Sequence, residues 1–438
     1  MTAAVLTIGT ELLRGELVDS NAAWLGEELT SLGLDVRRHL TVGDDVDDIA
    51  GALHSLLGQV RVVVATGGLG PTTDDRTSEA VARALGADLV RDDPSWEAIK
   101  RRYEARGRDL LPCHAKQAEF PRGARVLENP EGTAPGFAIE RDGVQAFFLP
   151  GVPREMKAIF ARSVVPRIAE LGHRDRCRLH VRVFGLPESE VAERLRPLEE
   201  SNPDVAFGFR ATFPEIEVKV EARAETASEA EERAKAVADR VRELLGDAAY
   251  GDRDDTFAGV VGQDLRSRGF TLAVAESCTG GLIGTMLTSV PGSSDYLLLD
   301  AVTYANSAKT QVLGVSPEIL RAHGAVSAET ACAMAEGARR AAGADLAIST
   351  TGIAGPGGGS DSKPVGTVWL GLASAEGTLA VRHQFHGDRA QVRTQAAYVA
   401  LEMVRRHLRG RDPAEGASAR TISDIVRHMD LRSRRQRP

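Results

Sequence analysis

The stretch Ala275-Glu-Ser-Cys-Thr-Gly-Gly281 lies between two short apolar runs, Leu272–Val274 before it and Leu282–Leu287 after it. This order predicts a buried strand, a sharp turn and a helix. The two glycines allow the main chain to approach a ligand closely at the helix start. Ser277 lies on the turn, where its hydroxyl is either a nucleophile that needs a base or the N-cap of the helix. These seven residues alone favour the cap, so the choice depends on the rest of the chain.

A candidate base follows in the segment Val302–Lys309, which reads VTYANSAK. A lysine acts as a base only if burial or neighbouring groups lower its pKa, because the free amine is protonated below about pH 10. The combination predicts a Ser277–Lys309 pair, with Tyr304 as a hydroxyl relay. The alternatives are an ordinary solvated helix lysine and an aromatic ring at the end of a strand.

A glycine-rich loop, Thr351–Gly359 (TGIAGPGGG), follows a strand predicted at Asp345–Ile348. So many glycines are costly in chain entropy, and they usually mark close approach of the main chain to a ligand, with a plain hairpin turn as the alternative. Their N–H groups suit a phosphate or an oxyanion. Arg389, just before a helix predicted at Gln391–His407, is either a phosphate ligand or the partner of a surface acid.

The first part of the chain alternates short apolar strands with helical segments. We expect strands at Ala3–Ile8, Leu34–Val42, Val60–Ala65 and Phe147–Leu149, and helices at Asn21–Leu32, Val46–Leu57 and Glu155–Val164. The alternation predicts a doubly wound α/β sheet, with the third strand central and parallel. Ligands of such sheets bind beyond the carboxyl ends of the strands.

Three loops at that predicted edge carry glycine and acidic residues: Gly9-Thr-Glu11, Gly43-Asp-Asp45 and Thr66–Asp75 (TGGLGPTTDD). Glycine N–H groups suit phosphate, and carboxylates suit a divalent metal that keeps water ligands. The alternative is that Asp74 and Asp75 only begin the next helix, where acids favour the dipole. The candidate phosphate-binding residues are Gly9, Thr10, Glu11, Gly67, Gly68, Gly70 and Thr72.

The middle of the chain predicts a small α+β module. Strands are expected at Cys177–Phe184 and Glu215–Ala222, and helices at Glu188–Leu198 and Ser228–Leu245. No GxxG, the loop with which a KH domain clamps RNA, occurs between Cys177 and Tyr250. The span Glu188–Glu243 holds 15 acids against 9 bases. A spacer or dimer contact is therefore favoured over nucleic-acid binding.

Composition sets further limits. The 438 residues have a net charge of -8, which argues against a general nucleic-acid or anionic-membrane binder. The four cysteines form no CxxC pair, and the sequence shows neither a secretory signal nor a long apolar run, so a cytoplasmic protein is expected. Residues 411–438 predict a mobile basic tail, with one or two helical turns over Thr421–Met429.

These motifs, in this order, resemble the CinA family of competence/damage-inducible proteins. The N-terminal strings Gly9–Asn21, Thr66–Asp75, Gly132–Phe137 and Leu149–Met156 are similar to its molybdopterin-binding-like domain. The C-terminal strings AESCTGG, VTYANSAK, HGAVS, TGIAGPGGG, KPVGTVW and GDR resemble its C-terminal domain, which also occurs alone as PncC, a nicotinamide mononucleotide (NMN) deamidase. The resemblance implies three domains: a molybdopterin-binding-like domain at residues 1–170, a KH-like domain at residues 176–250 and the CinA C-terminal domain at residues 255–410.

For the C-terminal domain, the resemblance implies hydrolysis of NMN to nicotinate mononucleotide and ammonia without a cofactor. Ser277 would be the nucleophile, Lys309 its base and Tyr304 a supporting hydroxyl. The substrate-binding positions implied there are Thr279, Gly280, Thr351, Gly352 and Arg389.

For the N-terminal domain, the resemblance implies metal-dependent cleavage of ADP-ribose to AMP and ribose 5-phosphate. Asp44 and Asp75 would sit at the acidic positions of that site, with magnesium, manganese or cobalt as the metal and potassium as a further candidate ion. The alternative is a module that binds a pterin cofactor or a protein partner without hydrolysis. A homodimer is expected on family grounds alone.

Overall fold

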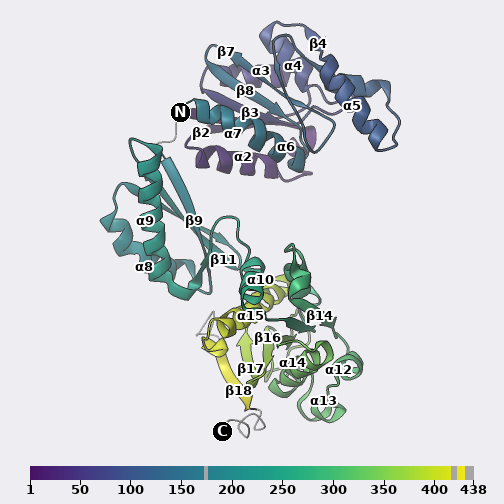
Figure 1. Ribbon diagram of the computed structural model, residues 1–438, viewed down its shortest axis with the longest axis vertical. Coiled ribbons are helices and arrows are strands. Elements are labelled where there is room, and N and C mark those ends of the chain that lie inside the picture. The colour runs from purple at the N-terminus through teal and green to yellow at the C-terminus, as the bar shows by residue number, and fades with distance from the viewer. Residues whose placement is uncertain (172–175, 416–421, 430–438) are drawn as a thin grey trace. The chain divides into compact units, whose positions relative to one another are not determined.

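The computed structural model describes residues 1–171, 176–415 and 422–429, and its architecture is mixed α/β throughout (Figure 1). Contacts divide the chain into two units, residues 1–178 with 221–234 and residues 179–220 with 235–438. Three sheets of four or more strands organise it, one for each of the domains expected from the sequence.

The N-terminal sheet has the strand order β2-β1-β3-β8-β7-β6. Its strands are β1 (Thr2–Ile8), β2 (Asp35–Val42), β3 (Val62–Thr66), β6 (Arg125–Leu127), β7 (Gly136–Arg141) and β8 (Val144–Leu149). β3 pairs in parallel with β1 and β8, so the prediction of a central parallel third strand is confirmed. The strand starts two residues later than predicted, because the N–H of Val60 still bonds to Leu56 O at the end of the preceding helix.

Helices cover both faces of this sheet. α3 (Val46–Leu57) and α4 (Thr77–Leu85) pack with alternate strand residues such as Leu6, whereas α2 (Ser20–Ser31), α6 (Pro153–Ile159) and α7 (Val165–Glu170) pack with the opposite set, such as Val5. The single helix predicted at Glu155–Val164 is interrupted, because a π-helical turn, Phe160–Val164, separates α6 from α7. Pro166 explains the break, since it has no N–H to continue the helical bonds.

The remaining elements of this part are short or peripheral. They are α1 (Thr10–Leu13), β4 (Leu89–Arg91), α5 (Asp93–Ala105), a 3-10 helix at Pro112–Ala118 and β5 (Glu119–Pro121).

The middle domain is a four-stranded sheet in the order β10-β11-β9-β12. Its elements are β9 (Arg176–Phe184), α8 (Glu188–Ser201), β10 (Val205–Thr212), β11 (Glu215–Arg223), α9 (Ala227–Leu245) and β12 (Ala249–Gly251). Of these strands, β9 and β11 match the prediction from the sequence, whereas β10 and β12 were not predicted. Both missed strands lie at edges, where half-exposed residues leave no clear alternation.

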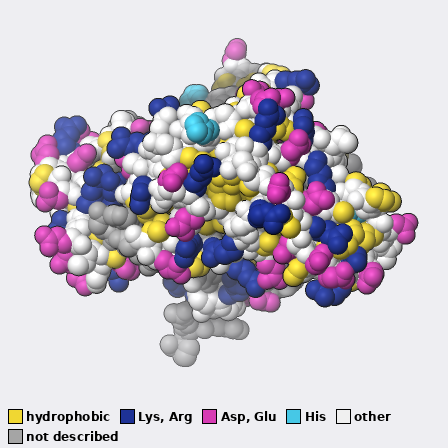
Figure 2. All heavy atoms as spheres, turned by 90° about the horizontal axis from the view of Figure 1, so that it is seen from above, with side chains coloured by type: hydrophobic (Ala, Val, Ile, Leu, Met, Phe, Trp, Pro, Cys, Tyr) yellow, Lys and Arg dark blue, Asp and Glu magenta, His cyan; other side chains and the backbone are white. Residues whose placement is uncertain are grey.

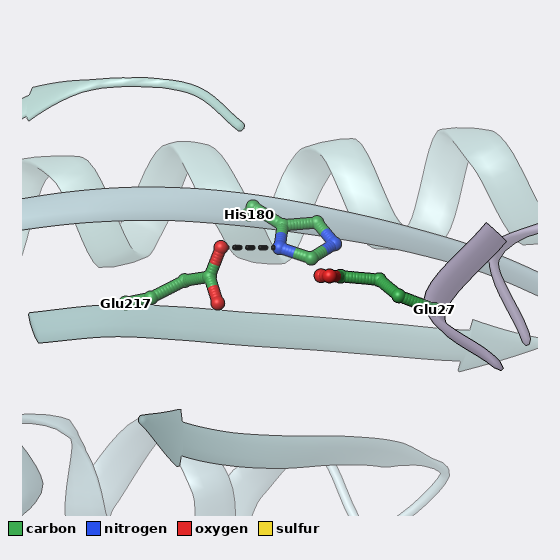
Figure 3. Close-up of side chains that lie close together, drawn as sticks. All are labelled: Glu27, His180 and Glu217. Atoms are coloured by element: carbon green, nitrogen blue, oxygen red, sulfur yellow. Dashed lines mark hydrogen bonds and ion pairs between the residues drawn. The ribbon is translucent and has the colours of Figure 1, made fainter. Parts of the chain in front are cut away.

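Charged cross-strand pairs line β9 and β11. Glu221 accepts from Arg178 at 2.8 Å, and Arg182 donates to Glu215 at 3.1 Å. Between them His180 Nδ1 lies 2.9 Å from a carboxylate oxygen of Glu217 (Figure 3). The hydrogen bond to His180 lowers the pKa of Glu217 to about 2. Arg178 and Arg182 thus each pair with one of the acids that made the composition of this segment acidic.

The C-terminal sheet has the order β14-β13-β15-β16-β17-β18. β13 (Leu272–Glu276) pairs in parallel with β14 (Leu297–Val302) and β15 (Leu346–Gly352), whereas β16 (Thr367–Ser374), β17 (Gly377–Gln384) and β18 (Ile422–Met429) continue the sheet antiparallel. One hydrophobic cluster joins α10 (Phe257–Arg268), α11 (Leu282–Thr288) and α15 (Arg389–Leu408) to one face. The other face is covered by α12 (Asn306–Leu313) and α14 (Ala328–Ala342), with α13 (Pro317–His323) beside them (Figure 1). β13 therefore lies inside the sheet, with the motif turn at its carboxyl end.

The helical turns predicted for Thr421–Met429 are wrong over the described residues of that segment. Ile422–Met429 forms β18, which pairs antiparallel with β17. Without β18 the edge of β17 would expose unpaired main-chain groups, and the β-branched Ile422, Ile425 and Val426 favour a strand that pairs with them. The predicted basic end of the tail, Arg432–Pro438, lies outside the described residues.

Two further observations concern membrane spans and surface charge. In the described part of the chain, no helix combines the length and hydrophobicity that a membrane span needs. On the face drawn in Figure 2, acidic and basic side chains are interspersed.

Candidate functional site

The turn after β13 places Ser277 beside Lys309, a residue of α12. Ser277 is buried, and its N–H donates to Thr350 O on β15 at 3.0 Å. The alternative role as helix N-cap is wrong, because the N-cap of α11 is Gly281. Gly280 and Gly281 have φ values of 63° and 90°, in the left-handed region that glycine tolerates, so the chain turns sharply enough to leave the serine at the strand end.

Lys309 meets Ser277 inside the domain. Its side chain is 1% exposed, and Nζ lies 3.0 Å from Ser277 Oγ, 2.8 Å from Thr303 O and 3.4 Å from Tyr304 O. The alternative of a solvated lysine is therefore wrong. Burial lowers the pKa of the Lys309 amine, because the charged form loses its hydration. All three neighbouring oxygens are neutral, and among the described residues none of the hydrogen-bond partners of the amine is a carboxylate that would hold it charged.

The hydroxyl of Tyr304 points elsewhere. Arg389 Nη2 donates to it at 3.0 Å, while the contact of Tyr304 with Lys309 is made by its main-chain oxygen. The predicted relay from Ser277 to Lys309 through this hydroxyl does not match the observed geometry, because the exposed ring turns outward from the strand end. The main-chain carbonyl of Tyr304 lies beside the Lys309 amine instead of the hydroxyl, and no sequence motif indicates this contact.

Arg389 connects two of the predicted segments. Its Nη1 donates to Gly355 O of the glycine-rich loop at 2.7 Å, and its Nη2 reaches Tyr304. The structure thus brings Arg389, Tyr304 and the glycine-rich loop together, and both of these hydrogen bonds from Arg389 go to neutral oxygens. A guanidinium has five N–H donors, so further donors remain for an anionic ligand.

The threonines of the two motifs stabilise the site from within. Thr279 and Thr350 share a 2.7 Å hydrogen bond between their hydroxyls and are fully buried. Thr351 Oγ1 donates to Ala325 O at 2.6 Å and is 1% exposed. Their predicted substrate contacts stay predictions, as does that of Gly352, which ends β15 close to the side chain of Val368.

Two residues that contact the Ser277 turn were not predicted from the sequence. Glu276, inside the quoted motif, is fully buried and accepts the N–H groups of Gly281 and Gly284, each at 2.9 Å. Arg393 donates to Thr279 O from Nε at 3.0 Å and from Nη2 at 2.8 Å. Its position four residues after Arg389, on the same helix face, was the available signal.

The N-terminal loops also meet at one edge, as predicted. Gly9 N–H donates to Val42 O, and Gly67 N–H donates to Leu149 O, each at 3.0 Å. Gly67 has φ 113°, and a Cβ there would lie 2.1 Å from Ile8 O, so the close approach requires glycine. The four parallel strands therefore end in adjoining loops.

The acidic residues of these loops are held by threonines. Asp44 accepts the N–H and the hydroxyl of Thr10 at 3.0 and 2.7 Å, both through Oδ2. Asp75 accepts the N–H of Thr72 at 2.8 Å through Oδ2, and the Thr72 hydroxyl also bonds to it. Asp74 and Asp75 precede α4 rather than begin it, since that helix starts at Thr77.

Other predicted residues of this edge have structural contacts. The carboxylate of Glu11 lies against Gly9, and that of Asp75 against Gly70, where an added Cβ would clash. Gly68 has φ 65°, and its carbonyl accepts the N–H of Thr77 at 3.1 Å. Within the described residues, Asp44 and Asp75 do not belong to a cluster of three potential ligand side chains tight enough to hold a metal alone.

Comparison with protein families assigns all three domains. Residues 4–170 match the model of the probable molybdopterin binding domain, residues 179–251 that of the damage-inducible protein CinA KH domain, and residues 254–408 that of the CinA C-terminal domain.

Whole-chain relatives agree with this assignment. A CinA-like protein of Anaeromyxobacter dehalogenans is 45% identical over 412 residues, which cover 93% of this chain and 100% of the relative. A CinA-like protein of Geobacter metallireducens is 45% identical over 410 residues, 93% of this chain and 99% of the relative. The crystal structure of CinA from Thermoplasma acidophilum is 42% identical, covers 38% of this chain and 97% of its own, and has a TM-score of 0.36. With three family domains in order and relatives of this identity along almost its whole length, the chain belongs to the CinA family.

Proposed function

We propose that the C-terminal domain hydrolyses NMN to nicotinate mononucleotide and ammonia. The observation that carries the proposal is the buried Lys309 amine 3.0 Å from Ser277 Oγ. A nucleophile and a base within hydrogen-bond reach are what acyl transfer requires. The CinA C-terminal domain match supports this reading, which places the protein in pyridine nucleotide salvage.

The surroundings of Lys309 suit a neutral amine. A neutral amine has two N–H donors and one lone pair, whereas the charged form has three donors. Thr303 O and Tyr304 O can take the two donors, which leaves the lone pair for the hydroxyl proton of Ser277. Burial acts in the same direction, since it disfavours the charged form.

The reaction then follows in two halves. Lys309 accepts the Ser277 proton as Oγ attacks the carboxamide carbon, and the resulting oxyanion is stabilised by main-chain N–H groups of the motif turn or the glycine-rich loop. Protonated Lys309 gives its proton to the departing ammonia, leaving an ester between Ser277 and the nicotinate group. Water, deprotonated by Lys309, attacks the ester carbon; the proton returns to Ser277 Oγ and nicotinate mononucleotide is released.

The substrate's anionic end fits Arg389. The guanidinium is exposed at the start of α15 and bridges Tyr304 to the glycine-rich loop. A phosphate there would orient the nucleotide, and Thr351 and Gly352, the last two residues of β15, would contact its carboxamide end. In this proposal Arg389, Thr351 and Gly352 bind the substrate, whereas Ser277 and Lys309 carry out the proton transfer.

An ammonia assay tests the proposal. Wild-type protein should release ammonia from NMN, and Ser277→Ala and Lys309→Ala should abolish the release. Full activity in the Ser277→Ala protein would refute the nucleophile assignment. Expressing each half of the chain separately, if both fold, would assign each product to its domain.

We also propose that the N-terminal domain cleaves ADP-ribose to AMP and ribose 5-phosphate. Asp44 and Asp75 each bind a threonine through one carboxylate oxygen, so the other oxygen of each suits a hard divalent cation such as magnesium, manganese or cobalt. The bound metal would supply charge stabilisation at the phosphates and an activated water. Incubation with ADP-ribose and a divalent metal tests this, and absence of AMP would favour the pterin-binding or partner-binding module instead.

A further inference from the structure

We propose that Glu276 and Arg393 are positioning residues that clamp the Ser277–Gly281 turn on the two sides of Gly280, the carboxylate through main-chain N–H groups and the guanidinium through a main-chain carbonyl. The inference rests on the proposed amidase function and deepens it. Neither side chain contacts the Ser277–Lys309 pair, so both act through the turn.

The carbonyl end of the clamp is formed from a different part of the chain. Arg393 lies in the first turns of α15 and directs two donors, Nε and Nη2, at the single oxygen of Thr279. Charge-assisted hydrogen bonds of this kind are roughly twice as strong as neutral ones. Because Arg389 lies one helical turn earlier and holds the glycine-rich loop through Gly355 O, the start of α15 ties together both loops of the site.

The N–H end is formed by a buried acid. Glu276 accepts Gly281 N–H and Gly284 N–H through different oxygens, so its carboxylate is bound by the first turn of α11. Asp300 lies beside Gly284, where a Cβ would come within 1.9 Å of its Oδ2. Burial and the neighbouring Glu276 raise the pKa of Asp300 to about 7.

Together the two contacts immobilise the most flexible point of the turn. Thr279 C=O and Gly281 N–H belong to the two peptide units that flank Gly280. Peptide units are planar, so holding one atom group of each unit leaves little freedom at Gly280, whose φ of 63° glycine would otherwise leave readily. The strand side is held already by the bond from Ser277 N–H to Thr350 O. The hydroxyl therefore stays within reach of Lys309.

The test compares full-length Arg393→Gln, Arg393→Lys and a matched control, Arg321→Gln, on an exposed arginine of α13. We expect Arg393→Gln to lower kcat for ammonia release from NMN about 10- to 100-fold with KM within about threefold, because a displacement of about 1 Å costs up to about 100-fold. Arg393→Lys, which keeps one charged donor, should recover part of the loss. The control should behave as wild type.

A second readout does not depend on turnover. In hydrogen exchange followed by mass spectrometry, the peptide spanning residues 277–284 should exchange faster in Arg393→Gln than in the wild type. Its exchange rate should be unchanged in the control. Glu276→Gln, which turns one acceptor into a donor facing a main-chain N–H, should have the same effect.

The outcomes separate the two proposals. An active wild type with unaltered kcat in Arg393→Gln, or a loss confined to KM, would overturn the clamp and leave the amidase function standing. A wild type that releases no ammonia would refute the proposed function. The clamp would then be judged by exchange alone, where faster exchange supports it and unchanged exchange overturns it.

Discussion

Replacing Lys309 by methionine tests whether the buried amine is the base. Methionine is of similar length and unbranched, so it fills the same space without a charge or a lone pair on nitrogen. The change removes the group 3.0 Å from Ser277 Oγ and leaves Thr303 O, formerly 2.8 Å from Nζ, without that donor.

The expected magnitudes differ for activity and stability. Loss of a general base typically costs about 100- to 10,000-fold in rate, or about 3 to 5 kcal/mol at 1.36 kcal/mol per decade. An unpaired carbonyl costs about 1 to 3 kcal/mol of folding free energy. Removing a buried amine opposes that cost, because its desolvation is no longer needed. We therefore expect a large fall in kcat and a change in unfolding free energy below about 2 kcal/mol.

The assay is steady-state ammonia release from NMN, with urea unfolding of the same preparations. Lys309→Arg is the matched variant, since it keeps a cation that cannot lose its proton. It should be as inactive as Lys309→Met, without recovery at high pH, whereas wild-type kcat/KM should rise with pH as the Lys309 amine deprotonates through its lowered pKa. If Lys309→Arg keeps more than about a tenth of the wild-type activity, which is well above the residual activity expected after loss of a base, the amine is not the base.

Further predictions concern the other contacts. Arg389→Lys should raise KM for NMN about tenfold with little change in kcat, measured by initial rates, because the fork to Gly355 O and a bound phosphate is lost. Gly67→Ala should lower the unfolding free energy by more than about 2 kcal/mol in urea titration, since its Cβ would meet Ile8 O; unchanged stability would contradict the required close approach. Asp75→Asn should reduce metal-dependent AMP formation from ADP-ribose and leave ammonia release unchanged; loss of both would argue against separate sites. Glu217, whose pKa is lowered to about 2, contributes stability above pH ~4 that is lost as the pH falls toward 2. Glu217→Gln should therefore lower the free energy of unfolding by up to about 3 kcal/mol at pH 7, and this difference from the wild type should shrink in acid. Urea unfolding at each pH measures the difference.

The order of strands and helices could be derived from the sequence alone, because a parallel strand buried on both faces is a short continuous apolar run, whereas a helix with one buried face repeats its apolar residues every three or four positions. β1, β3 and β13 are buried runs of the first kind, and α3 has the helical spacing. The loops after these strands carry the motifs. Ser277 and Lys309 were paired because a nucleophilic serine needs a base and the following motif supplies an amine. Both residues follow strands of one parallel set, β13 and β14.

Tertiary structure alone decided which atoms face one another. The carbonyl rather than the hydroxyl of Tyr304 reaches the amine, and Arg393 bonds to Thr279 from a helix more than a hundred positions away. β10 and β18 were missed because an edge strand is defined by the neighbour it pairs with, not by its own alternation. Local periodicity records which side of a segment is buried, whereas a hydrogen bond between distant segments depends on how those segments pack, and no single stretch of sequence contains that information.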